Sequence, residues 1–260
     1  MKRRNFVAAS ASAAAAGLAG AGAPEPVENA FFHLVYFNMR TGSQVERTTR
    51  YLQNVWLPAA RRAGIGPVGF FCTVVGDRSP FILSVASYPS WAAVETIHKK
   101  LAEDKVFQKG WDDYNAISDP AYVRTESSLL RAFDGMPAIE VPPADAKRAP
   151  RIFELRTYES VNEKASRRKV KMFEDGEIAI FRRLGMTPVF FGQTIVGPNL
   201  PNLIYMLAFD DLASRERRWR DFGADPEWQK LRAQPGLSDA EIVSNISNAI
   251  LRPLAFSPIR

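Results

Sequence analysis

The pattern of apolar and polar residues divides the first half of the chain into short strands and amphipathic helices. Aromatic and β-branched runs are typical of strands, and an apolar residue every three or four positions is typical of helices. Gly64 is a typical C-terminal end for the first helix, and Ser90 is a suitable N-cap for the second. The pattern predicts the order strand, helix, strand, strand, helix, strand, at residues 31–40, 43–63, 67–75, 81–88, 90–101 and 122–133.

The second half of the chain repeats the first. Residues 32–131 can be laid over residues 153–252 at a constant offset of 121 without a gap, and the matched pairs include Gly64/Gly185 and Pro80/Pro201. The repeat predicts the same order of elements again, at residues 152–158, 163–184, 188–196, 202–209, 212–222 and 243–254. This βαββαβ order is that of the ferredoxin-like fold.

Two such repeats are expected to cover each other. A four-stranded sheet with both helices on one face leaves its other face bare, and a bare apolar face must be buried. We therefore predict an α+β fold in which the two repeats form an intramolecular dimeric α+β barrel with a space between the sheets. The expected boundaries are residues 30–135 for the first repeat, 136–150 for a proline-containing linker and 151–260 for the second repeat.

The first 23 residues have the composition of an export signal. Arg3 and Arg4 are followed by Asn5, Phe6 and a weakly apolar run of alanine and glycine, which resembles a twin-arginine signal peptide. The run is too short and too weakly apolar for a stable membrane span. We therefore expect an exported, periplasmic protein without a stable membrane span in its mature form.

Composition and charge exclude several other classes. Apolar residues make up 46% of the chain and charged residues 24%, as in ordinary globular proteins. The net charge is +6, but the basic runs, such as residues 167–171, alternate with acids or apolar residues, so we expect solvated helix faces and no nucleic-acid partner. The chain has two histidines and one cysteine, so no metal site is expected. No cofactor is expected either.

Candidate site residues lie on the first strand of each repeat. Alternate residues of a strand share a face, so His33 and Phe37 occupy the places that Glu154 and Tyr158 take in the second repeat. If this more polar face points into the space between the sheets, these four side chains and Arg156 would form a pocket for an anionic or carbonyl-bearing ligand. Alternatively, Glu154 and Arg156 pair with neighbours on an exposed or interface strand.

The second repeat resembles the NIPSNAP family. The resemblance is carried by the strand Phe153-Glu154-Leu155-Arg156-Thr157-Tyr158 and by the segment Ala224-Asp225-Pro226-Glu227-Trp228-Gln229. It covers the second repeat well and the first loosely, and residues 245–253 resemble exported bacterial members. The resemblance implies a ferredoxin-like domain and a dimeric α+β barrel, but no defined activity or catalytic residues.

Three functions are consistent with these features. The first is an exported barrel that binds a small molecule or a partner protein between its sheets. The second is a cofactor-free enzyme, monooxygenase-like or isomerase-like, in which Glu154 or Tyr158 transfers a proton and Arg156 fixes an oxyanion. The third is a haem-binding barrel with His98, on the second helix, as a weak candidate ligand. The inequality of the repeats predicts one pocket at most, and a homo-oligomer stays open.

Overall fold

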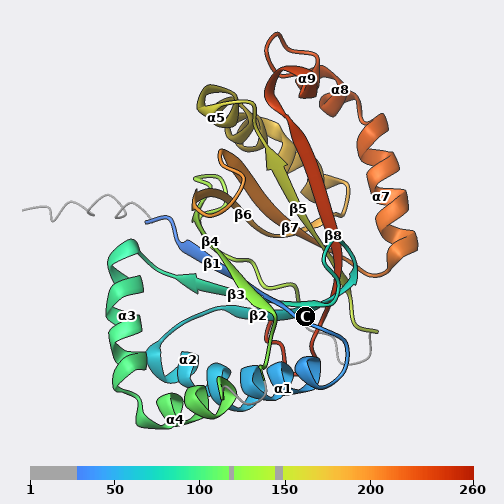
Figure 1. The fold of residues 1–260 in the computed structure, drawn as a ribbon. Helices are drawn as coiled ribbons and strands as arrows, with labels where there is room; N and C mark the ends of the chain where they lie inside the picture. The colour runs from blue at the N-terminus through green and yellow to red at the C-terminus, as the bar shows by residue number, and fades with distance from the viewer. Residues whose placement is uncertain (1–27, 117–119, 144–148) are drawn as a thin grey trace, which may run out of the picture.

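The computed structural model describes residues 28–116, 120–143 and 149–260. Its strands are β1 (Phe31–Asn38), β2 (Val68–Val75), β3 (Phe81–Tyr88), β4 (Arg124–Ala132), β5 (Ile152–Glu159), β6 (Thr187–Val196), β7 (Asn202–Phe209) and β8 (Asn245–Pro253). They form one closed barrel in the order β1-β3-β2-β8-β5-β7-β6-β4 (Figure 1). Every pairing is antiparallel. The predicted fold, two ferredoxin-like repeats in one barrel, is confirmed.

Each repeat supplies one half of the barrel, and hydrogen bonds join the halves at two seams. At one seam β2 pairs with β8, with Thr73 opposite Leu251. At the other, β4 pairs with β6, with Leu130 opposite Thr194. The edge strands of both halves are therefore paired, which removes the free edges that two separate sheets would expose.

The helices lie on the outside of the barrel, each group against its own half (Figure 1). Those of the first repeat are α1 (Ser43–Tyr51), η1 (Leu52–Trp56), α2 (Leu57–Ala63), α3 (Trp91–Glu103) and α4 (Lys105–Tyr114). Those of the second are α5 (Glu163–Met172), η2 (Phe173–Glu177), α6 (Ile178–Arg183), α7 (Leu212–Ala224), α8 (Pro226–Arg232) and α9 (Asp239–Ile242). The π-helical segments η1 and η2 begin and end at residues related by the same offset of 121, so the repeat holds in three dimensions.

Apolar side chains fill the interior of the barrel. Phe32 packs against Phe190 with ring centroids 5.4 Å apart, and Phe71 packs against Phe153 at 4.9 Å. Because strand residues alternate between faces, the neighbours of Phe32 and Phe153 must point outward, toward the helices. The expectation that the more polar faces of β1 and β5 point into the space between the sheets is therefore wrong.

The predicted signal peptide, residues 1–23, lies outside the described residues. No helix in the described ranges is long and apolar enough to cross a membrane. The described part of the predicted linker packs on the barrel, since Ile139 joins the interior cluster and the backbone nitrogen of Glu140 donates to Val189 at 2.9 Å.

Candidate functional site

Glu154, Arg156 and Tyr158 are brought together by the structure, but beneath the helices of the second repeat. The Glu154 carboxylate is fully buried and accepts hydrogen bonds from Arg156 at 2.9 Å, Arg215 at 2.6 and 2.9 Å, Trp219 at 2.7 Å and Asn248 at 2.9 Å. Burial by itself would raise the pKa of Glu154, but the Arg215 hydrogen bond and the Arg156 charge lower it overall. The charged carboxylate of Glu154 therefore connects strand β5 to helix α7 through hydrogen bonds.

Arg156 fills the rest of this interface. Its guanidinium donates to the Tyr158 hydroxyl at 3.1 Å and lies 4.5 Å from the ring centre of Trp219. Tyr205 donates to Tyr158 at 3.1 Å. The three predicted side chains thus bond to one another and to their neighbours, as the alternative prediction held, but on a helix-covered face rather than an exposed or interface strand.

A buried ion pair that was not predicted from the sequence lies next to this network. Lys169 on α5 and Glu177 on η2 are both buried, and their charged atoms are 3.3 Å apart. Burial raises the pKa of Glu177. The basic run at residues 167–171 was expected on a solvated face, and for Lys169 this expectation is wrong, because its turn of α5 faces the barrel.

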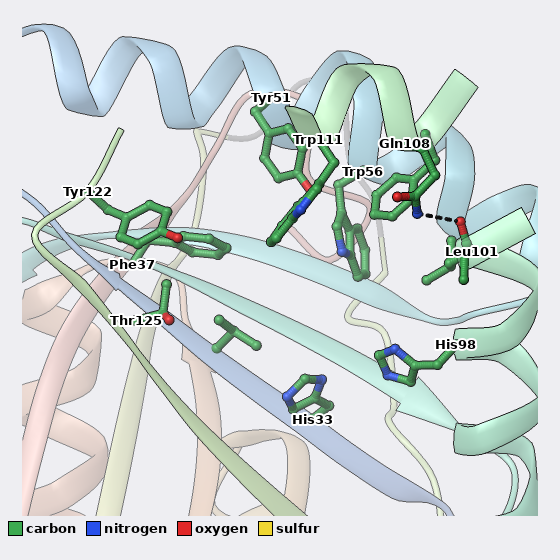
Figure 2. A pocket seen from close by; sticks show the side chains of 13 residues that line it. His33, Phe37, Tyr51, Trp56, His98, Leu101, Gln108, Trp111, Tyr122 and Thr125 are labelled. Carbon is green, nitrogen blue, oxygen red and sulfur yellow. Dashed lines mark hydrogen bonds between the residues drawn. The ribbon is translucent and has the colours of Figure 1, made fainter. Parts of the chain in front are cut away.

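The first repeat has an open pocket at the same helix–sheet interface (Figure 2). This first-repeat pocket encloses about 400 Å³ between β1 and the helices η1, α3 and α4. It contains His33 and Phe37 of the predicted set and His98, the weak haem-ligand candidate, together with residues that were not among the predicted site residues. Its lining consists of His33, Val35, Phe37, Tyr51, Trp56, His98, Leu101, Ala102, Phe107, Gln108, Trp111, Tyr122 and Thr125.

The pocket carries no fixed charge. Among the described residues, its lining includes no lysine, arginine, aspartate or glutamate. Burial, and secondarily the His98 ring, lower the pKa of His33 from 6.5 to about 4, so its imidazole is neutral at pH 7. One nitrogen of His33 lies 2.6 Å from the Ser127 hydroxyl. The site therefore suits a ligand whose surface is mainly apolar and makes few polar contacts.

Tyr51 brings one unsatisfied polar atom to the pocket. Its ring stacks on Tyr114 at 4.0 Å, and Figure 2 shows its hydroxyl end directed toward the cavity beside Trp111. The hydroxyls of Tyr114 and Tyr122 have partners, Thr48 at 2.9 Å and Asn115 at 3.0 Å, whereas the buried Tyr51 hydroxyl has none. An unpaired buried hydroxyl costs roughly 1–3 kcal/mol. The Tyr51 hydroxyl is itself buried, so it lies beside the pocket rather than on its accessible surface.

Two substitutions between the repeats explain why one interface is open and the other filled. Val35 stands at the position of Arg156, and His98 stands at the position of Trp219. The guanidinium and the indole stack on each other in the second repeat, so the smaller pair leaves their space empty in the first. The enzyme hypothesis had placed a site in the second-repeat half, and the structure places the larger free volume in the other.

The first-repeat pocket does not suit haem. The two propionate carboxylates of haem need cations or hydrogen-bond donors as partners, and the described lining offers no lysine or arginine. His98 is exposed at the rim, where its ring stacks on Tyr88 at 6.2 Å. His98 therefore has the surroundings of a rim residue rather than of a buried axial ligand.

Known proteins resemble this chain at two levels. A family model described as NIPSNAP matches residues 153–258. A NIPSNAP-like domain protein from Burkholderia xenovorans is 29% identical over 42% of this chain and 89% of its own, with a TM-score of 0.37. No curated protein matches the chain.

Solved structures also match both repeats together, and two of them illustrate this level of similarity. One is from Lactobacillus acidophilus and is provisionally described as a monooxygenase; it is 10% identical, covers 87% of this chain and 94% of its own, and has a TM-score of 0.58. The other, from Fusobacterium nucleatum and described in the same way, is 10% identical, covers 87% and 93%, and has a TM-score of 0.56. At this identity the likeness shows a shared fold.

Proposed function

We propose, for a chain whose residues 153–258 form a NIPSNAP domain, that the protein binds a small, mainly apolar organic molecule in the first-repeat pocket. One observation carries this proposal: an aromatic-lined cavity of about 400 Å³ in the first repeat lies where the second repeat is filled by its own side chains. Pockets for small organic ligands have volumes of roughly 300–1,000 Å³ and mostly apolar linings. The site differs from the predicted one, which lay between the sheets.

The second repeat would then serve as the rigid partner of the barrel. Its Glu154 network ties α7 to β5, and the seams between β2 and β8 and between β4 and β6 connect it to the binding repeat. This division of roles agrees with the inequality of the repeats in the sequence.

Binding can be measured by titrating the protein with the neutral probe 1-naphthol in a calorimeter. Val35→Phe adds a ring inside the pocket and should weaken binding by about tenfold or more, which corresponds to about 1.4 kcal/mol. Val196→Phe is the matched control, because Val196 is 57% exposed and lies outside the pocket. Equal affinity in the wild type and Val35→Phe would place the binding site elsewhere.

A cofactor-free enzyme is the second candidate, now at the first-repeat pocket rather than at Glu154, Arg156 and Tyr158. The observation in its favour is the position of His33, whose imidazole lines the pocket and lies 2.6 Å from the Ser127 hydroxyl, where it could exchange a proton with a bound substrate. Its lowered pKa of about 4 makes it a weak base in this role. The proteins of similar fold that are described as monooxygenases suggest oxygen consumption as the assay. Uptake that survives in His33→Gln would remove His33 from this role.

We also propose that the protein is exported to the periplasm through a twin-arginine signal. The support is the sequence Arg3-Arg4-Asn5-Phe6 and the weakly apolar run that follows it. Replacing Arg3 and Arg4 by lysine should strongly reduce the periplasmic yield and leave a longer precursor in the cytoplasm. An unchanged periplasmic yield would contradict this route.

A further inference from the structure

The second repeat encloses a cation of its own in an aromatic cage. The ammonium nitrogen of Lys169 lies 5.2 Å from the ring centre of Tyr158, 5.0 Å from that of Phe173 and 5.5 Å from that of Trp228. The carboxylate of Glu177 lies 3.3 Å away and balances the charge. Aromatic faces attract cations because their quadrupole is negative above the ring, and Trp does so best.

The first-repeat pocket is the equivalent cage without its cation. At the offset of 121, Tyr158 corresponds to Phe37, Glu177 to Trp56 and Trp228 to Phe107, and these three first-repeat residues line the pocket. The third ring of the cage, Phe173, corresponds to Leu52, which is buried and does not line the pocket. Met172, whose sulfur is 3.7 Å from the Lys169 ammonium, corresponds to Tyr51, which also lines the pocket. The position that corresponds to the Lys169 ammonium therefore falls within the cavity.

The residue that would supply the cation is missing. Thr48 occupies the position of Lys169, is fully buried, and uses its hydroxyl to bond to Tyr114 at 2.9 Å and to the Ala121 carbonyl at 3.2 Å. Its short side chain does not belong to the pocket lining. The first repeat has thus lost the internal cation and keeps aromatic residues at two of the three ring positions, Phe37 and Phe107, while Trp56 adds an indole at the position of Glu177.

The surroundings have also changed in a way that selects among cations. Trp56 replaces the carboxylate of Glu177, so a ring face replaces a full negative charge. A small, strongly hydrated ammonium would lose its water without a charged partner, whereas an alkylated ammonium has a weakly hydrated, apolar surface that suits ring faces. No lysine or arginine among the described lining residues opposes a positive ligand.

We propose that the ligand of the first-repeat pocket is an organic cation with a quaternary or otherwise fully alkylated ammonium group. The charged head lies among Phe37, Trp56 and Phe107, in the space that corresponds to the Lys169 ammonium, and the apolar remainder of the ligand fills the pocket. This inference rests on the proposed function, for which it names the ligand class.

Calorimetry on the mature protein can compare benzyltrimethylammonium with its uncharged carbon isostere, neopentylbenzene. The cation should bind about tenfold more tightly, as expected from a desolvated cation–π contact of about 1–2 kcal/mol. Equal affinities, or binding of 1-naphthol without binding of the cation, would overturn the cation inference while leaving the proposed function intact. If the folded protein binds none of the three probes, both the cation inference and the proposed function are overturned.

Two variants separate the cation contact from simple packing. Trp56→Leu should weaken binding of the cation about tenfold and binding of the isostere much less, and Trp91→Leu, at a site 55% exposed and outside the pocket, should change neither. Equal weakening of both ligands by Trp56→Leu would overturn the inference.

The double variant Thr48→Lys with Trp56→Glu introduces the ion pair of the second repeat and should abolish cation binding. Circular dichroism would confirm that it folds. If it does not fold, Trp56→Leu remains the decisive variant.

Discussion

The indole nitrogen of Trp219 donates a hydrogen bond of 2.7 Å to the carboxylate of Glu154 and so ties helix α7 to strand β5. In the first repeat the same two positions hold His98 and His33, whose rings are 6.5 Å apart. These substitutions, together with Val35 at the position of Arg156, accompany the difference between a filled interface and one that borders a cavity. The stability of the two interfaces should differ accordingly.

Glu154→Gln should strongly destabilise the protein. The substitution removes the charge that balances Arg156 and Arg215, whose side chains are only 15% and 19% exposed. Removing one partner of a buried ion pair costs about 3–5 kcal/mol, because the remaining charge stays buried. Urea unfolding would measure the loss. The matched control is His33→Gln at the equivalent position, where we expect less than about 1 kcal/mol; a similar loss at both sites would show that the Glu154 charge does not act as an anchor.

Lys169 and Glu177 should show strong energetic coupling. Lys169→Met leaves a buried carboxylate without its cation, and Glu177→Leu leaves a buried ammonium, so each should cost several kcal/mol, on the order of 3–5. The double variant removes both charges and should cost less than the sum of the two. A coupling energy near zero in this double-mutant cycle would mean that the pair contributes no mutual stabilisation.

The fold could be predicted from the sequence, but the orientation of its strands could not. Alternation shows which residues share a face, and the repeat shows that Phe32 and Phe153 are equivalent, but neither shows which face points inward. The polar face was expected inside because Glu154 and Arg156 suggested a site. In the structure Phe32 and Phe153 point into the apolar interior, and the charged groups Glu154 and Arg156 are buried under helices that supply partners.

The candidate site was predicted only in part. His33 and Phe37 could be found because they lie on a strand next to polar residues. Trp56 and Phe107 could not, since an aromatic residue on an amphipathic helix usually belongs to the core. The available signal was the comparison of the repeats: the exchange of Lys169 for Thr48 changes a long cation into a short neutral side chain.

His33 should make stability depend on pH. Its pKa is about 4 in the folded protein and 6.5 in its ordinary state, so the unfolded chain binds more protons between these values. The contribution of His33 to stability is therefore fully present above about pH 6.5 and is lost as the pH falls toward 4, by about 1–3 kcal/mol for a half-buried side chain.

Urea unfolding across this pH range would show the effect as a difference between variants. His33→Gln should lose less stability than the wild type on acidification, whereas His98→Gln, which removes only the secondary cause of the lowered His33 pKa, should keep most of the dependence on pH. Acidic groups whose pKa is lowered, such as Glu154 and Asp225, add the same loss of stability at low pH in all three proteins, so the difference between variants isolates the histidine. Parallel curves for the wild type and His33→Gln would contradict the lowered pKa of His33.

Gly192 should be required at the seam where β4 meets β6. A Cβ atom at this position would lie 2.8 Å from the Cβ of Leu130, a distance that forces one strand to shift, and overpacking of this kind costs about 1–3 kcal/mol. Gly223, near the end of α7, is the matched control, since a Cβ there meets no atom within 4 Å. Gly223→Ala should therefore be neutral or stabilise by up to about 1 kcal/mol through helix propensity. Because the seam joins the repeats, Gly192→Ala should also lower the temperature at which they unfold together, and an unchanged melting temperature would show that the β4–β6 contact does not limit the stability of the barrel.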